Sequence, residues 1–242
     1  MSEVLSGAEF KKQLRAGVPK LGLFVNSHSP TVAEQLAHSG YDWLLIDTQH
    51  GPMNYTTLST MLAGVSSGGA KSLVRVAGYQ DRAGIQQSLD MGADGVLVPY
   101  INNAEEARQA VSCCKYPTAG TRSVYFPQRS MNKDGLLGYA GNWNKNAIVA
   151  LQVETASCIE NIEEIALFRG HDISLISRLT HHRLTNSIKI GVSVVSRQGA
   201  RRGCLPGRRS SVFRGDGRPE HSGRDRKRAT TRGDISRRFV LS

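Results

Sequence analysis

Short runs of apolar, β-favouring residues recur roughly every 25 residues along the first three quarters of the chain, and turn-forming residues bound each run. A segment compatible with a helix follows most of them. Strands that alternate with helices at this spacing indicate right-handed βαβ units and a parallel sheet. The six predicted strands cover residues 21–25, 43–46, 72–76, 95–99, 147–154 and 173–176.

Residues that commonly begin helices lie between these strands. The candidate N-caps are Ser29 before Pro30, Asn54, Asp81, and Asn103 with Glu106 three residues further on. The segment over residues 115–146 interrupts the rhythm, and Gly135, Gly138 and Gly141 favour a loop over a regular element there. Loops of that length usually have a function.

These units predict an α/β fold of the (β/α)₈ TIM-barrel type, which typically needs about 250 residues. The 242 residues of the chain leave room for eight units. Residues 178–242, however, supply no convincing further pair. We therefore expect an incomplete barrel of about six βα units over residues 1–177 and an Arg/Gly/Ser-rich, largely disordered tail over residues 178–242.

Charge is divided unevenly along the chain. Residues 1–170 carry 14 Lys and Arg against 15 Asp and Glu, whereas residues 171–242 carry 17 against 5, so the excess behind the net charge of +11 lies in the last part. That part has 15 Arg but two Lys, and two of the 15 aromatic residues. The change indicates that two different compositions have been joined.

The basic tail raises the alternative of a module that binds nucleic acid or another polyanion. Its lack of interleaved aromatic residues and of a recognised fold argues against a nucleic-acid partner. No segment reaches the roughly 20 apolar residues that span a bilayer, and residues 1–20 lack the apolar centre of a signal peptide. The four cysteines show no paired metal-ligand spacing. We therefore expect a reduced, cytoplasmic protein that does not associate with a membrane.

Polar residues follow the predicted strands at the end where parallel α/β folds place their chemistry. Asp47, Gln49 and His50 follow the second strand, and a carboxylate can orient an imidazole for proton transfer. A capping Asp47 and a solvated His50 are the structural alternative, because a single Asp-x-x-His motif has low specificity.

The third and fifth strands add further polar residues. Arg75 lies at the end of the third strand, and Gln152 and Glu154 end the fifth. A carboxylate for a divalent metal, an arginine for an anionic substrate and a histidine for proton transfer would together stabilise an enolate. Alternatively, Glu154 caps the next helix and Arg75 pairs with a neighbouring acid.

Several stretches together resemble the HpcH/HpaI aldolase family of metal-dependent pyruvate aldolases. They span roughly residues 5–176 in the family's order and spacing. The stretches are WLLIDTQHGP at 43–52, LVRV at 73–76, GVLVP at 95–99, NAEEAR at 103–108, YPTAGTR at 116–122 and LQVET at 151–155.

The resemblance implies a carbon-carbon lyase that cleaves 4-hydroxy-2-oxo acids to pyruvate and an aldehyde through a metal-stabilised enolate. Glu154 would be a metal ligand for Mg²⁺, Mn²⁺ or Co²⁺, and Arg75 would bind the pyruvate carboxylate or enolate oxygen. His50, oriented by Asp47, would be the acid/base group, and Gln152 would line the site. No lysine Schiff base is required.

The chain departs from the family pattern at two places. Gln49 stands where the family usually has Glu, which removes a negative charge near the site. After the sixth strand, the family's Gly-Pro-x-Asp-Leu motif, whose Asp is the second metal ligand, is missing from residues 177–182. Asp172 lies too early in the strand to replace it.

Because the resemblance fails where the composition changes, we interpret residues 178–242 as the product of a frameshift, a mis-spliced exon or a gene-model error. The chain would then be inactive as written, and the alternative function is that of a truncated, non-catalytic relative with a polyanion-binding tail. Relatives form homo-oligomers, commonly hexamers that exchange C-terminal helices. That expectation does not transfer to a chain without those helices.

Overall fold

Six parallel strands form the first part of the sheet, as the sequence predicts. The computed structural model describes residues 4–125, 138–168, 170–177, 192–195 and 238–239. The parallel strands pair in sequence order. They are β1 (Gly22–Val25), β2 (Trp43–Asp47), β3 (Lys71–Arg75), β4 (Gly95–Val98), β5 (Ile148–Val153) and β6 (Ile173–Ser177).

The helices begin at the predicted caps. The side chains of Ser29, Asn54, Asp81 and Asn103 each accept a hydrogen bond from a backbone amide in the first turn of the helix that follows. These helices are α2 (Pro30–Ala37), α3 (Tyr55–Ser67), α4 (Arg82–Asp90) and α5 (Ala104–Cys114). The segment after β5 is divided at Asn161 into two short helices, α7 (Ala156–Glu160) and α8 (Ile162–Leu167).

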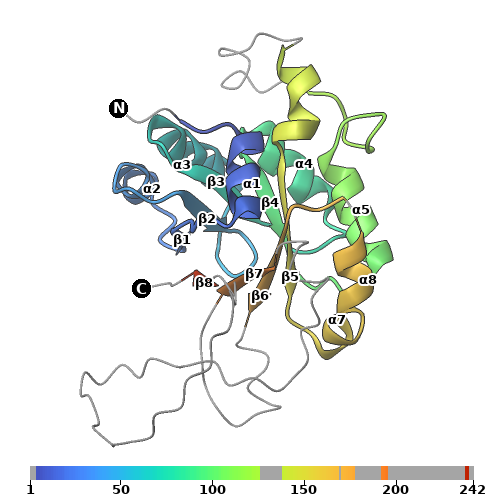
Figure 1. The fold of residues 1–242 in the computed structure, drawn as a ribbon. Helices are drawn as coiled ribbons and strands as arrows, with labels where there is room; N and C mark the ends of the chain where they lie inside the picture. The colour runs from blue at the N-terminus through green and yellow to red at the C-terminus, as the bar shows by residue number, and fades with distance from the viewer. Residues whose placement is uncertain (1–3, 126–137, 169, 178–191, 196–237, 240–242) are drawn as a thin grey trace, which may run out of the picture.

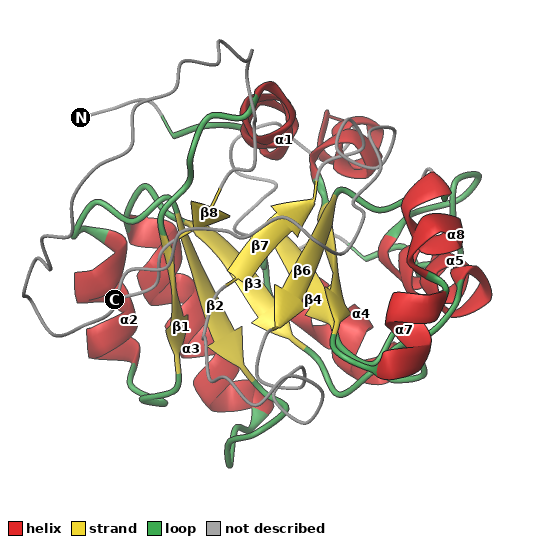
Figure 2. Ribbon diagram, turned by 60° about the horizontal axis from the view of Figure 1, so that its bottom comes forward, coloured by secondary structure: helices red, strands yellow, loops and turns green. Residues whose placement is uncertain are grey.

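Alternate residues of the strands face two different apolar clusters. The outward cluster lies between the sheet and the helices and includes Leu44, Ile46, Val74, Val96 and Val149. Figures 1 and 2 show these helices on the outer side of the curved sheet. Successive residues of a strand point to opposite faces of the sheet, and here both faces are buried. This explains why the predicted strands are continuously apolar.

The inward cluster is closed at one end by helix α1 (Gly7–Ala16), which lies across the end at which the strands begin (Figure 2). Phe10 of α1 packs with residues from four strands and is 2% exposed. Two hydrogen bonds hold α1 to the start of β5, from Lys11 Nζ to the Ala147 carbonyl (2.8 Å) and from the Ala8 amide to Asn146 Oδ1 (3.1 Å). The inner strand residues of the cluster are Trp43, Leu45, Leu73, Leu97, Ile148 and Ala150.

The last two strands run antiparallel to their neighbours. β7 (Val192–Val195) pairs with β6, and β8 (Arg238–Phe239) pairs with β7. These two short strands were not expected from the sequence. The rest of the tail over residues 178–242, and with it the prediction of disorder, lies outside the described residues.

The prediction of a loop throughout residues 115–146 is wrong in its last part, because residues 138–146 are helical. Tyr139 and Trp143 lie one turn apart in that helix, and both are buried. The guanidinium of Arg122 lies between the rings of Tyr116 and Trp143, at 4.6 and 4.4 Å from their centroids, and donates to Asp90 (2.7 Å). This packing outweighs the low helix propensity of the glycines.

Cys113, Cys114 and Cys158 are free thiols buried in the outward cluster. Burial raises the pKa of Cys114 to about 12 and that of Cys158 to about 11, so both remain protonated at neutral pH. None of the helices in the described part of the chain combines the length and apolar character needed to cross a membrane.

Replacing Phe10 with Ala tests whether α1 closes the inner cluster. We expect Phe10→Ala to lower the free energy of unfolding by about 3–5 kcal/mol, because a large aromatic side chain leaves a cavity in a packed core. Lys12→Ala in the same helix is the control, since the Lys12 side chain is 77% exposed. Urea unfolding measures both variants, and equal small losses would contradict the proposed packing.

Candidate active site

Asp47 and Arg75 lie side by side on the inner face of the sheet. Each comes two residues after an inward leucine, and the register of β2 and β3 pairs them directly. Arg75 Nε donates to Asp47 Oδ1 (2.9 Å), and Arg75 Nη2 donates to Asp47 Oδ2. The side chains are 2% and 11% exposed. The arrangement is a bidentate, buried ion pair, so Arg75 does pair with a neighbouring acid.

Burial alone would raise the pKa of Asp47, but the hydrogen bonds and charge of Arg75 outweigh it and hold the pKa below its ordinary value. The backbone amide of Gln49 donates to Asp47 Oδ1 (3.1 Å), and the backbone amide of His50 adds to the same effect. Asp47 is therefore ionised at neutral pH. It fixes Arg75 and the start of the following loop together.

His50 is exposed in that loop. Asp47 contacts it through the backbone amide, and the expectation that this carboxylate orients the imidazole stays a prediction. Thr48 anchors the loop to β3, because its Oγ1 donates to the Arg75 carbonyl (2.6 Å). The loop also packs closely on His28, whose Nε2 would lie 2.1 Å from a Cβ at Gly51.

Gln152 and Glu154 extend the same inner face at the end of β5. Gln152 is 2% exposed, follows the inward Ala150 by two residues, and donates from Nε2 to Glu154 Oε2 (3.0 Å). Gln152 Oε1 is buried and has no hydrogen-bond partner in the part of the chain that the structure describes. The next helix is capped by Thr155, so the alternative that Glu154 is its N-cap is wrong.

Two neighbours of these residues were not predicted from the sequence. Tyr100, after β4, has φ of 55° and donates its backbone amide to Glu154 Oε1 (3.0 Å). Phe24 lies beneath Arg75, with the guanidinium carbon 5.3 Å from the ring centroid. Alternation along β1 was the available signal for Phe24. The left-handed backbone of a tyrosine has no comparable signal.

A sequence model of the HpcH/HpaI aldolase/citrate lyase family matches residues 20–179, which is more than half of the chain. The chain belongs to this family. The match ends beside the change in composition, and it contains every candidate site residue described above.

Curated relatives and a solved structure support the same family. A 2-dehydro-3,6-dideoxy-6-sulfogluconate aldolase from Pseudomonas putida is 40% identical over 152 residues, 63% of this chain and 59% of that protein. A hydroxypyruvate/pyruvate aldolase from Sagittula stellata is 37% identical over 163 residues, 67% of this chain and 64% of that protein. The chain thus spans about three fifths of these relatives.

Among solved structures, an HpcH/HpaI aldolase/citrate lyase family protein from Burkholderia cenocepacia superposes with a TM-score of 0.65 at 28% identity. The similarity covers 73% of this chain and 71% of that one. The described sheet is therefore part of the TIM-barrel-type fold of this family.

The oxygen atoms at the end of β5 fit a hard divalent cation. Mg²⁺ is commonly held by one or two carboxylates and completes its coordination with substrate and water oxygens. Glu154 supplies one carboxylate. Oε1 of Gln152, which has no hydrogen-bond partner among the described residues, is a second oxygen that can face a cation. No group of three His, Cys, Asp or Glu side chains in the described residues could hold a metal alone.

Asp172 does not contribute to this site. It precedes β6, at the end of the sheet where α1 lies, and it pairs with Lys11 and Arg15. Its place before β6 agrees with the position expected from the sequence. Residues 178–182, where the family motif would end, lie outside the described residues.

Removing Asp47 tests the buried ion pair. We expect Asp47→Ala to lower the free energy of unfolding at neutral pH by about 3–5 kcal/mol, because Arg75 is left buried and unpaired. The folded pKa of Asp47 lies below the ordinary value of about 3.9, so this stabilisation is present above that pH. It is lost as the pH falls through the folded pKa.

The matched control is Glu105→Ala, which removes the carboxylate of the exposed Arg108–Glu105 pair. Such pairs contribute about 0–1 kcal/mol. Urea unfolding of both variants at neutral and acidic pH measures the contrast. Similar losses of unfolding free energy in the two variants at neutral pH would show that the buried Asp47 pair is no more stabilising than the exposed pair.

Proposed function

We propose that this chain is a metal-dependent carbon-carbon lyase that cleaves 4-hydroxy-2-oxo acids to pyruvate and an aldehyde. One observation carries the proposal. A fixed cation at Arg75 and an oxygen pair at Gln152 and Glu154 extend one inner face, immediately beyond the apolar layer. The names of the two curated relatives, which are both aldolases, support this reaction class.

Arg75 would bind the substrate's carboxylate or the oxygen that becomes the enolate. Its Nε and Nη2 atoms are engaged by Asp47, which leaves the Nη1 edge for a substrate anion. Because the guanidinium is held in place before substrate arrives, little reorganisation is needed when negative charge develops. Asp47 is thus a positioning residue.

Glu154 would hold the divalent cation, and Gln152 would line the site with its unpartnered Oε1. When bound, Mg²⁺, Mn²⁺ or Co²⁺ supplies Lewis-acid polarisation of the 2-oxo group. The amide of Tyr100 and the Nε2 of Gln152 keep both oxygens of Glu154 oriented. With one described carboxylate, the site binds a cation weakly and needs a high metal concentration.

His50 would act as the acid/base group. It takes the proton from the 4-hydroxyl as the bond between C3 and C4 breaks, the aldehyde leaves, and the electron pair passes into the enolate. Protonation at C3 then yields pyruvate, and the proton returns from His50. The exposed position of His50 in the loop after β2 is compatible with contact to a substrate that enters from solvent.

Pyruvate release from 4-hydroxy-2-oxo acids tests the function. We expect activity that depends on Mg²⁺, Mn²⁺ or Co²⁺, is abolished by a chelator, and falls by at least about 100-fold in Glu154→Gln, since a metal supplies several kcal/mol. Glu160→Gln, an exposed residue of α7, is the matched control. Failure of the wild-type chain with all three metals would leave a non-catalytic relative.

We further propose that the family domain ends near residue 177, that residues 178–242 arise from a change of reading frame, and that the protein works in the cytoplasm. The buried free thiols fit a reducing compartment. The transcript across codons 170–185 tests the frame. We expect another frame there to encode Gly-Pro-x-Asp-Leu, and its absence from all frames would refute the frameshift.

A further inference from the structure

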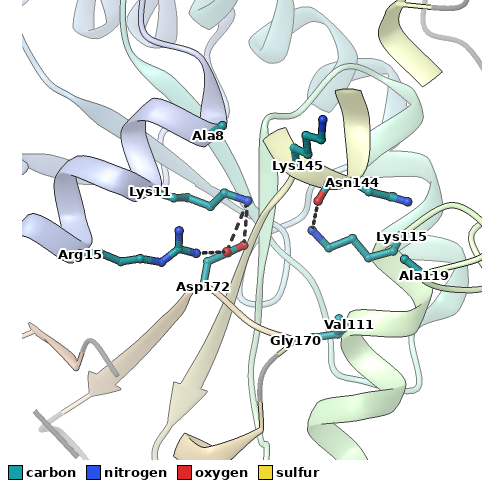
Figure 3. A pocket seen from close by; sticks show the side chains of 10 residues that line it. All are labelled: Ala8, Lys11, Arg15, Val111, Lys115, Ala119, Asn144, Lys145, Gly170 and Asp172. Atoms are coloured by element: carbon teal, nitrogen blue, oxygen red, sulfur yellow. Dashed lines mark hydrogen bonds and ion pairs between the residues drawn. The ribbon is translucent and has the colours of Figure 1, made fainter. Parts of the chain in front are cut away.

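A cavity of about 380 Å³ lies at the opposite end of the sheet from the candidate active site. It is bounded by α1, the end of α5, the helix over residues 138–146 and the turn before β6 (Figure 3). Ala147, which precedes β5, accepts hydrogen bonds from two lysines beside the cavity, whereas Glu154 follows β5. The six residues of β5 separate them by about 20 Å, so the cavity is a separate site.

Cationic side chains dominate the lining. Lys11 and Arg15 come from α1, Lys115 follows α5, and Lys145 belongs to the helix over residues 138–146. Asp172 is the one carboxylate in the lining. With all groups ionised, the lining carries a net positive charge.

Asp172 is already engaged by the cations on one side. Its oxygens contact Lys11 Nζ (3.3 and 3.4 Å) and Arg15 Nη2 (3.0 Å), and Oδ2 also accepts from the Val149 amide (3.1 Å). The single negative charge of Asp172 is thus shared between the positive charges of Lys11 and Arg15. Its charge also raises the pKa of Lys115 and so opposes the effect of burial there, but the two side chains form no ion pair.

Lys115 is the cation with the least compensation. It is 7% exposed, and its Nζ donates to the carbonyls of Asn144 (2.9 Å) and Ala147 (3.4 Å). No carboxylate of the described residues lies within ion-pair distance of it. A buried ammonium with neutral acceptors alone is costly, and an anion in the cavity would offset that cost.

The charge of Lys115 also acts on the buried Lys11. Burial and, to a smaller extent, the positive charge of Lys115 lower the pKa of Lys11 to about 8, although Asp172 raises it. Burial likewise lowers the pKa of Lys115. Figure 3 shows both ammonium groups pointing toward the space between α1 and the residues after α5. An anion between them would convert this repulsion into two attractions.

We propose that this cavity binds a small oxyanion carrying a phosphate group. The volume falls near the lower end of the range for small-molecule sites, roughly 300–1,000 Å³, which suits inorganic phosphate or a small phosphate ester. Lysine is a common phosphate-binding residue, and Arg15, half exposed at the rim, adds a planar donor. The inference does not depend on the proposed lyase activity.

Calorimetric titration with inorganic phosphate and with glycerol 3-phosphate tests the site, with chloride at matched ionic strength and glycerol as blanks. We expect binding of both phosphates and neither blank. Tighter binding of the ester would identify an esterified ligand, and equal binding would identify phosphate itself. Lys115→Met is expected to lower the affinity by about tenfold or more, because a charge-assisted hydrogen bond is lost.

Lys145→Met serves as the second variant, since Lys145 is exposed and its replacement leaves the buried network intact. It is expected to weaken binding as well, whereas Lys12→Met, in α1 but outside the lining, should leave it unchanged. A phosphate bound instead at Arg75 would be insensitive to Lys145→Met. Absence of binding, or equal affinity in wild type and Lys145→Met, would overturn the proposal.

Discussion

The buried ion pair between Asp47 and Arg75 joins two adjacent strands where the inner face of the sheet changes from apolar to polar. Neither charge is stable there alone, because an unpaired buried ion costs several kcal/mol. The pair in turn fixes the loop after β2, through the Gln49 amide on Asp47 and the Thr48 hydroxyl on the Arg75 carbonyl. The orientation of the cation and the position of His50 therefore depend on one interaction.

The inner face has an apolar middle and two polar ends. Phe10, Leu45 and Leu97 belong to the buried apolar cluster between these ends. At one end Glu154 is held by the Tyr100 amide and Gln152, and at the other Asp172 is held by Lys11 and Arg15. Glu154 therefore lies in an oxygen-rich site, whereas Asp172 lines a cationic cavity.

The predictions that were confirmed depend on local chemistry. Ser29, Asn54, Asp81 and Asn103 cap helices because each side chain accepts a hydrogen bond from the backbone amide three residues further on. The six strands were visible because both faces are buried. The position of Asp47, Arg75, Gln152 and Glu154 at one end of the sheet follows from the parallel direction of the strands.

The features that were missed depend on contacts distant in sequence. Residues 138–146 form a helix because Trp143 packs on Arg122, whose guanidinium also reaches Asp90. The pairing of Arg75 with an acid was raised as an alternative, but the acid could not be identified as Asp47 because the contact depends on the register of two strands. Tyr100 adopts its left-handed backbone beside Glu154, 54 residues away.

The central claim is that Arg75 and Glu154 form one site for a divalent cation and a 2-oxo acid. Titration of Mn²⁺ followed by water-proton relaxation, with and without oxalate as a mimic of the pyruvate enolate, tests it directly. Oxalate should tighten Mn²⁺ binding by about tenfold or more, as linked ligands do, and Glu154→Gln should remove the effect. Equal Mn²⁺ affinity with and without oxalate would contradict the account.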